Sequence, residues 1–466
     1  MRQSYKVAGV LYGSVSVVAM QLGMLNFPQF VATCTEFLVP NELVENRGPF
    51  QELMQCIPME NDIGLSMITS ALFSGGAVGC LISDYCNFYH VFPLRWEFLG
   101  ALALEGLSLL GLVYSESIHG VAMWRFVGGL GCGVVLGIVP TYVDLLTELK
   151  LMPKQVANLG YMVSLALGVA VCQVVSWPVI DSFNWRWIFV YHLILVVGNM
   201  LAVLTMLVES PKWYLIMRDK AGTKESLRQY LEGTQEEHDI SRVIDKWGQE
   251  LDDIVRLHLE STASNTVYER IRYWILYVYR NLADVGPLTT KMVLVQCFNF
   301  NFMDLYGIKV IKEIMPDSTF PVNVALSCLN VALPFASVYL WEEVRSQVDW
   351  RAGHIFVYLS ITAAYFFVFL SFHYHSKLAF MVSMVFLSVT THTLMTSEPL
   401  INLAEGSDDP MVHHQQIPMK RYSRLCYWVG GAILAYCFPL VFDLIGHRAM
   451  FLIGLLPCIS LLIVLT

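Results

Sequence analysis

Neutral amide side chains stand inside apolar stretches of this 466-residue chain, among them Gln296, Asn299, Asn301 and Asn330. A side-chain amide both donates and accepts hydrogen bonds, so it can bind a hydroxyl group in either role without burying a charge. Polar side chains at membrane depth are costly, and they generally serve a solute pathway or a contact between helices. The pattern therefore predicts either a binding site for a neutral, hydroxylated solute or a set of interhelical hydrogen bonds.

Two aromatic residues stand close to these amides in the sequence. Phe302 follows Asn301 directly, and Tyr306 comes five residues after Asn301. A ring face can stack on a ring-shaped solute, although aromatic residues more often pack a helix bundle or anchor it at the lipid interface. We expect Phe302 and Tyr306 to contribute to solute binding together with Gln296, Asn301 and Asn330.

Ionisable residues inside the apolar stretches are scarcer: Glu105, Arg125, Asp304 and Glu398. A charge within a membrane is expensive and commonly marks an ion or proton pathway. Coupling to protons needs a group of this kind that changes its charge during the transport cycle.

The composition requires that lipid surround most of the chain. Hydrophobic residues make up 56% of it and charged residues only 14%, and the mean hydropathy is +0.54. A soluble protein would carry about 25% charged residues. The net charge of −9 does not indicate a nucleic-acid partner, because the acids gather in residues 35–62 and in one polar insert. We find no metal-ligand spacing and no nucleophile–base pair, so neither an enzyme nor a cofactor is predicted.

Twelve apolar runs have about the 17–25 residues that a helix needs to cross the hydrocarbon layer. The sequence thus predicts an all-α membrane protein with twelve transmembrane helices. The predicted spans are 8–30, 64–83, 96–114, 122–146, 156–178, 187–208, 291–313, 321–341, 354–372, 378–402, 426–444 and 448–466.

The spans divide into two sets of six around a charged insert. We expect a first six-helix half over 1–213, a helical insert over 214–290 and a second half over 291–466. Apolar residues recur at helical spacing in 226–231 and 240–257, which predicts amphipathic helices on the membrane surface.

The distribution of Lys and Arg predicts the orientation. Most of the 29 basic residues fall on the side that holds both termini and the insert. The positive-inside rule makes this side cytoplasmic. We expect a plasma-membrane protein. Cys34 and Cys56 would then lie near the outer face, where they could be bridged or remain two free thiols.

The first half contains a series of ordered motifs: Arg125-Phe-Val-Gly128-Gly129-Leu-Gly131-Cys-Gly133, then Pro140, Tyr142 and Asp144, Asn184-Trp-Arg-Trp187, and Glu209-Ser-Pro-Lys-Trp213. In this order they resemble the sugar porter family of the major facilitator superfamily. The second half is similar but fainter: Gln296, Asn301 and Tyr306 resemble one family motif, and Asn330 lies twelve residues before Glu342.

The resemblance implies two six-helix halves with a solute site at mid-membrane between them. It also implies that Gln296, Asn301 and Asn330 face a sugar. The halves echo one another, since Asp84 is followed by Arg95 and Glu342 by Arg345. The resemblance assigns gating or charge-pairing roles to Asp84, Arg125, Asp144, Glu209, Glu342 and Arg345. The glycines of the fourth span either shape a moving helix or, as we favour, allow close helix packing.

Several residues depart from the family pattern. Met162, Val295, Trp428 and Ala432 stand where the family has polar sugar contacts, which weakens recognition of a fully hydroxylated hexose. The family's proton-coupled members pair the Arg of the fourth span with an Asp in the first. Here no carboxylate lies between residues 2 and 36. This absence favours facilitated diffusion over symport, although Glu105 or Asp304 could take the role of the missing Asp.

We therefore predict a facilitative, uniport-like transporter of a sugar or sugar-like neutral solute that works by alternating access. Its partners would be that small molecule and the bilayer. One alternative is a sensor or receptor that keeps the fold without transport, favoured by the lost contacts. Another is a carrier of an organic ion, which would need Asp304 or Glu105 to face the cavity.

Overall fold

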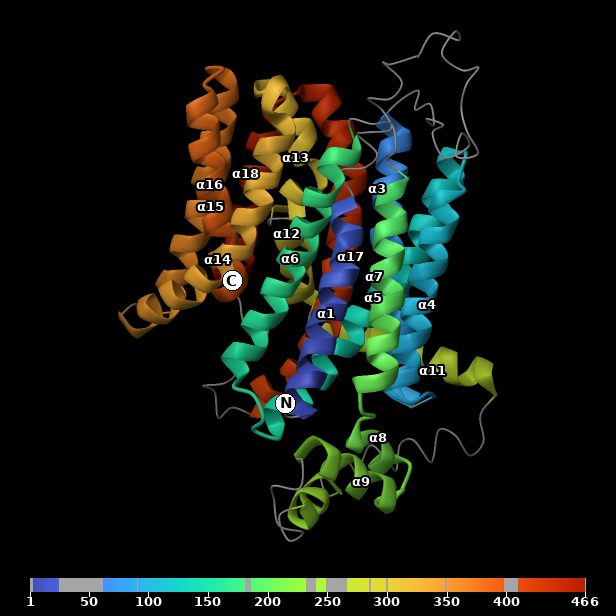
Figure 1. Cartoon of the computed structure of the whole chain (residues 1–466). Helices are drawn as coiled ribbons and strands as arrows, with labels where there is room; N and C mark the ends of the chain where they lie inside the picture. The colour runs from blue at the N-terminus through green and yellow to red at the C-terminus, as the bar shows by residue number, and fades with distance from the viewer. Residues whose placement is uncertain are drawn as a thin grey trace, which may run out of the picture.

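The computed structural model shows a bundle of long helices (Figure 1). It describes residues 3–24, 62–89, 91–180, 186–231, 240–248, 266–284, 286–298, 301–347, 350–397 and 410–465. Some residues within these ranges have side chains that the structure does not describe, mainly 281–289, 301–304, 340–351, 394–397 and 410–423. Every regular element in the described part is a helix.

Six long helices form the first half, and each covers one predicted span. They are α1 (Gln3–Gly23), α3 (Asp62–Tyr89), α4 (Leu94–Val113), α5 (Ile118–Glu148), α6 (Lys154–Ile180) and α7 (Trp187–Met206). All six are long and apolar enough to cross a membrane.

The second half holds the other six predicted spans. Helices α12 and α13 cover the predicted span 291–313; residues 299–300, Asn299 among them, lie outside the described residues. The helices are α12 (Gly286–Phe298), α13 (Asn301–Ile314), α14 (Thr319–Gln347), α15 (Trp350–His373), α16 (Lys377–Ser397), α17 (Pro410–Ile445) and α18 (Arg448–Leu465). A short 3₁₀ turn, η4 (Pro316–Ser318), precedes α14.

The two halves stand side by side in Figure 1. Helices α14, α15 and α16 lie at one flank, α3 and α4 at the other, and α1, α6, α12 and α17 between them. Helix α6 packs against α14 and α17 packs against α3, so each half contributes to both contacts. The fold is the predicted twelve-helix bundle.

Glycines allow α3 and α5 to approach closely. A Cβ atom on Gly129 would fall on the carbonyl oxygen of Leu72, and one on Gly133 would fall on that of Gly76. Without side chains at these places, the two backbones meet directly. The glycines of the fourth span therefore pack helices, as predicted.

The insert contributes short helices at the end of the bundle where α1 begins (Figure 1). They are α8 (Pro211–Ile216), α9 (Lys220–Leu231), a helical stretch over 240–248 and α11 (Val267–Asp284). The predicted helix at 226–231 begins earlier, at Lys220, and the described part of the predicted helix 240–257 ends at residue 248.

Candidate functional site

Two of the predicted amides are buried in the second half. Gln296 on α12 is 3% exposed and packs against α17, where a Cβ on Gly430 would lie 2.6 Å from its own Cβ. Asn330 on α14 is 6% exposed, and its Oδ1 atom has no hydrogen-bond partner in the described structure. A buried acceptor without a partner costs roughly 1–3 kcal/mol. Asn330 is thus prepared to accept a hydrogen bond from a hydroxyl group.

The structure places Tyr306 in packing contacts. Its ring is fully buried, lies 4.7 Å from that of Phe438, and its hydroxyl donates to the Ala435 carbonyl on α17. Tyr365, which the sequence reasoning missed, donates in the same way to the Phe298 carbonyl at 2.9 Å. These bonds tie α12 and α13 to their neighbours. The side chains of Asn301, Phe302 and Asp304 lie outside the described residues.

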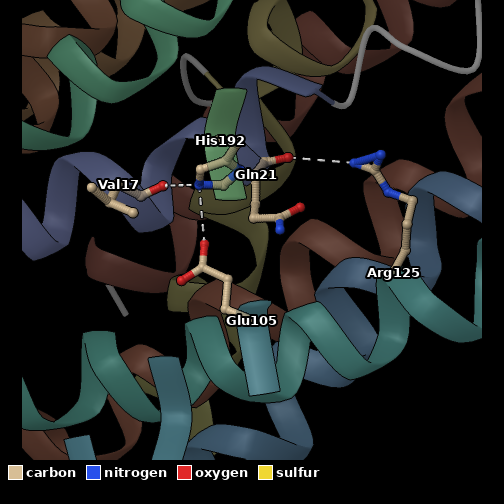
Figure 2. Close-up of polar contacts among 5 residues, drawn as sticks. All are labelled: Val17, Gln21, Glu105, Arg125 and His192. Atoms are coloured by element: carbon tan, nitrogen blue, oxygen red, sulfur yellow. Dashed lines mark hydrogen bonds and ion pairs between the residues drawn. The ribbon is translucent and has the colours of Figure 1, made fainter. Parts of the chain in front are cut away.

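Arg125 is completely buried and binds the carboxyl end of α1 (Figure 2). Its Nη1 atom donates to the Met24 carbonyl at 3.2 Å and its Nη2 atom to the Gln21 carbonyl at 3.4 Å. The last carbonyls of a helix lack partners within the helix and carry partial negative charge. The Arg125 charge is therefore held by a helix end in place of an acidic side chain.

A second charged group lies in the same half, on α4. Glu105 faces His192 of α7, with 3.3 Å between Oε1 and Nε2, and both side chains are 0% exposed. The same Nε2 atom lies 2.7 Å from the Val17 carbonyl on α1. Figure 2 shows Glu105, His192 and Arg125 converging on α1. The sequence reasoning named Glu105 but missed His192, although it is the only basic residue in the predicted span 187–208.

Glu209 caps a helix far away in the sequence. Its two carboxylate oxygens accept from the backbone N–H groups of Leu94 at 3.1 Å and Arg95 at 3.0 Å, at the start of α4. Its own carbonyl accepts from the Ser226 hydroxyl at 2.6 Å, which joins α9 to this point. Burial raises the pKa of Glu209, while bonds from Ser210, Arg95 and Leu94 act in the opposite direction.

Lys212, in the same motif, joins two further elements. Its ammonium group lies 2.5 Å from Glu148 at the end of α5 and 5.1 Å from the Trp247 ring centre. Asp144, to which the resemblance assigns a gating or charge-pairing role, is exposed and lies one helical turn before Glu148. The sequence reasoning missed Glu148, which shares a helix face with Asp144 at a spacing of four residues.

Asp84 is bonded to the insert. Its Oδ2 atom accepts from Nε1 of Trp274 on α11 at 3.1 Å, and the Tyr89 hydroxyl donates to the Arg270 carbonyl at 3.0 Å. Helix α11 thus contacts the end of α3. Glu342 and Arg345, the predicted counterparts in the second half, lie outside the described side chains.

Two polar contacts connect the halves directly. Arg424 on α17 donates to the Gly137 carbonyl on α5. On the α6 and α14 side, Nδ2 of Asn323 donates to Oε1 of Gln173 at 2.9 Å, and Gln173 in turn donates to the Gly23 carbonyl at 2.8 Å. Any movement of one half against the other must change some of these bonds.

A family model described as "Sugar (and other) transporter" matches residues 21–466. The chain belongs to this family. It is 25% identical to the Vacuolar protein sorting-associated protein 73 of Saccharomyces cerevisiae, over 97% of this chain and 90% of that protein. It is likewise 25% identical to a probable metabolite transport protein of the same yeast, over 91% and 83% of the two chains.

Solved structures agree on the fold. The xylose transporter XylE from E. coli, in a partially occluded inward-open conformation, superposes with a TM-score of 0.67 and 13% identity, over 98% of this chain and 96% of that one.

A further relative in sequence is a facilitated glucose transporter, member 2 of solute carrier family 2 in Rattus norvegicus, which is 23% identical over 76% of this chain and 64% of its own. The protein is a multi-pass membrane transporter of the sugar porter type, with a major-facilitator fold. This family and this fold are those of membrane transporters and not of enzymes.

Proposed function

We propose that the protein carries a sugar or sugar-like neutral solute across the membrane by alternating access of its two halves. The single observation that supports this most directly is the buried Oδ1 atom of Asn330, which has no partner in the described structure. A hydroxyl group of a solute would satisfy it without introducing a charge. Gln296, and with it Asn301 and Phe302, would complete the site from α12 and α13.

Counterflow exchange tests this proposal. The purified chain is reconstituted into vesicles preloaded with an unlabelled sugar, and uptake of the same labelled sugar is followed for hexoses, trehalose and polyols. A carrier gives saturable, transient accumulation for at least one of them. The absence of saturable flux for every member of the panel would contradict the proposal.

The organic-ion alternative receives no support from Glu105. Its carboxylate is buried against His192 inside the first half, between α4 and α7, and so does not face the second half. Trp428 stands where the family has a polar sugar contact, and its ring packs against Phe73 with 5.8 Å between ring centres. The loss of such polar contacts favours a neutral solute with fewer hydroxyl groups than a hexose.

Some observations support uniport, and others support transport coupled to protons. The described part of α1 carries no carboxylate beside Arg125, which supports uniport. The Glu105–His192 pair supports proton coupling instead, because it is ionisable and buried at membrane depth. The effect of a pH gradient on uptake distinguishes the two.

A receptor without transport is the second candidate. One yeast relative is named for vacuolar protein sorting. If this chain serves such a role, it binds a solute or partner but exchanges nothing. Binding of a labelled sugar without counterflow would favour the receptor over the carrier. We place the carrier in the plasma membrane with both termini in the cytoplasm; fluorescence microscopy of a tagged chain would distinguish this from a vacuolar membrane.

A further inference from the structure

The described groups around Glu105 leave two proton-accepting atoms open. The Val17 carbonyl can only accept, so the Nε2 atom of His192, 2.7 Å away, carries a hydrogen. In the neutral ring Nδ1 of His192 is then bare, and it has no hydrogen-bond partner in the described structure. Neither oxygen of Glu105 has a hydrogen-bond partner there, apart from the 3.3 Å approach of Oε1 to His192. With Glu105 ionised and His192 neutral, these acceptors leave room for one more proton.

The charges nearby permit one proton to be gained or lost. With Glu105 ionised, His192 neutral and Arg125 charged, the buried charges sum to zero. One added proton makes the sum +1, which a dry interior disfavours and a hydrated one tolerates. The other titratable groups that face this region are the thiols of Cys132 on α5 and Cys172 on α6; the described part of α1 contributes no charged side chain.

Polar groups connect the pair with the end of α1. Gln21 is fully buried and neither atom of its amide has a partner in the described structure; in Figure 2 its side chain lies between the pair and Arg125. Arg125 in turn binds the Met24 carbonyl, where the described part of α1 ends. An amide both donates and accepts, so Gln21 can bridge water or a proton donor to Glu105.

The end of α1 also contacts the second half. Helix α1 touches α13, and Met20 and Met24 of α1 belong to one apolar cluster with Ile308 of α13. When the halves separate on this side, Ile308 leaves and water gains access to Gln21. Hydration of the pair therefore depends on the conformation of the transporter.

From this arrangement, we infer that Glu105 and His192 form a proton-binding site that couples solute movement to a pH gradient. One proton from solution binds to the pair when the Met24 side opens and returns to solution on the opposite side. No other group is consumed, and the pair is regenerated in each cycle. The bound proton is shared by both residues, which lie within contact distance of each other. The coupling part of the inference rests on the proposed carrier function.

The proton site is tested without transport by infrared spectroscopy of the reconstituted full chain. A protonated buried carboxyl gives a carbonyl band that the ionised form lacks. We expect this band to appear in the wild type as the pH is lowered and to be absent from Glu105→Gln. In His192→Gln its midpoint should move, because the partner that shares the proton is gone. Cys132→Ser, which changes a neighbouring thiol only, should keep the wild-type titration.

Coupling is tested with labelled hexoses, trehalose and polyols in vesicles whose outside is acidified. The wild type should accumulate at least one probe uphill, and a protonophore should abolish this. Glu105→Gln and His192→Gln should lose most of the gradient effect, measured relative to each variant's own counterflow exchange. Cys132→Ser should retain it.

The outcomes separate the two proposals. A wild-type spectrum without a carboxyl band that grows as the pH is lowered overturns the proton site, and this result needs no variant. A band that keeps its full size in Glu105→Gln overturns it as well. A titrating band together with wild-type uptake that ignores the gradient overturns the coupling. If no probe is taken up, the carrier proposal fails, and the infrared titration still decides whether the pair binds a proton.

Discussion

Arg125 and Arg186 each bind the carboxyl end of a helix. Arg186 donates to the carbonyls of Val113 at 2.7 Å and Ser115 at 2.8 Å, at the end of α4. Arg125 does the same for α1. A planar guanidinium can reach two carbonyls at once, which an ammonium group cannot. Two residues of the family motifs thus connect helices by capping them.

Asn330 and Asn323 lie on the same helix, two turns apart, and provide a matched comparison. We expect Asn330→Leu to reduce counterflow exchange strongly and to leave stability unchanged or raise it, because its Oδ1 atom has no partner to lose and its burial is a cost that Leu removes. Asn323→Leu should instead cost roughly 1–3 kcal/mol, because it leaves buried Gln173 without its partner. Exchange assays and thermal unfolding in detergent measure the two effects.

Equal losses of stability in both variants would mean that Asn330 is a packing residue. In that case the solute site must be sought elsewhere in the second half. Wild-type exchange in Asn330→Leu would lead to the same conclusion.

Residue-level prediction from the sequence succeeded where a polar group stands alone in an apolar run. Gln296, Asn330 and Glu105 were all identified as buried polar groups in this way. Whether the two amides bind solute stays a prediction. His192 was missed because a single histidine in an apolar run has no partner in the sequence. Glu105 is 87 positions away, and only the packing of α4 on α7 brings the two together.

At the level of elements, helix ends are where distant parts of the chain meet. Glu209 at the beginning of α8 caps α4, and its carbonyl is held by α9. Such contacts follow from the four unpaired N–H groups at every helix start. The sequence predicted the long helices well, since length and apolar composition decide them. It could not predict the partners of the caps, which depend on tertiary packing.

We expect Glu209→Ala to destabilise the protein by about 1–2 kcal/mol, the cost of losing a helix cap. Glu209→Gln should cost less, because it retains one acceptor oxygen. Lys212→Met is the matched control: its ion pair with Glu148 is one-third exposed on each side, so we expect a change of at most about 1 kcal/mol. Thermal unfolding ranks the three variants. A larger loss for Lys212→Met would show that the motif acts through its ion pair.

The contact between α3 and α5 gives a second prediction at this scale. Gly129→Ala should cost about 3 kcal/mol or more, because the new methyl group would meet backbone atoms of Leu72 and Gly76, which cannot move aside. Gly13→Ala on α1 meets nothing within 4 Å and should be neutral or stabilising by up to about 1 kcal/mol. Size-exclusion chromatography of the detergent-solubilised variants measures the folded fraction. Similar yields for both would exclude the close packing described here.

For the whole molecule, the contacts between halves decide which conformation is populated. The Arg424 bond to Gly137 joins α17 to α5, while α1 and α13 meet near Met24. A transporter that alternates must break one set of contacts as it keeps the other. Asp84, to which the resemblance assigns a gating or charge-pairing role, is bound by Trp274 of the insert. The balance between the halves therefore depends on contacts that the family motifs do not specify.

Arg424→Met should open the bundle on the α5 and α17 side. A hydrogen bond to a charged group contributes roughly 1.5–3 kcal/mol, which corresponds to a population shift of about one to two powers of ten. Cys80 on α3 is buried within electrostatic reach of Arg424, whereas Cys132 is buried against α4 inside the first half. Alkylation followed by peptide mass spectrometry should show faster labelling of Cys80 and no change at Cys132. Equal acceleration at both thiols would indicate general unfolding, and no acceleration at Cys80 would show that the Arg424 bond does not control the opening. Because relative movement of the halves separates α17 from α3 and α5, a selective response at Cys80 is the result expected of alternating access.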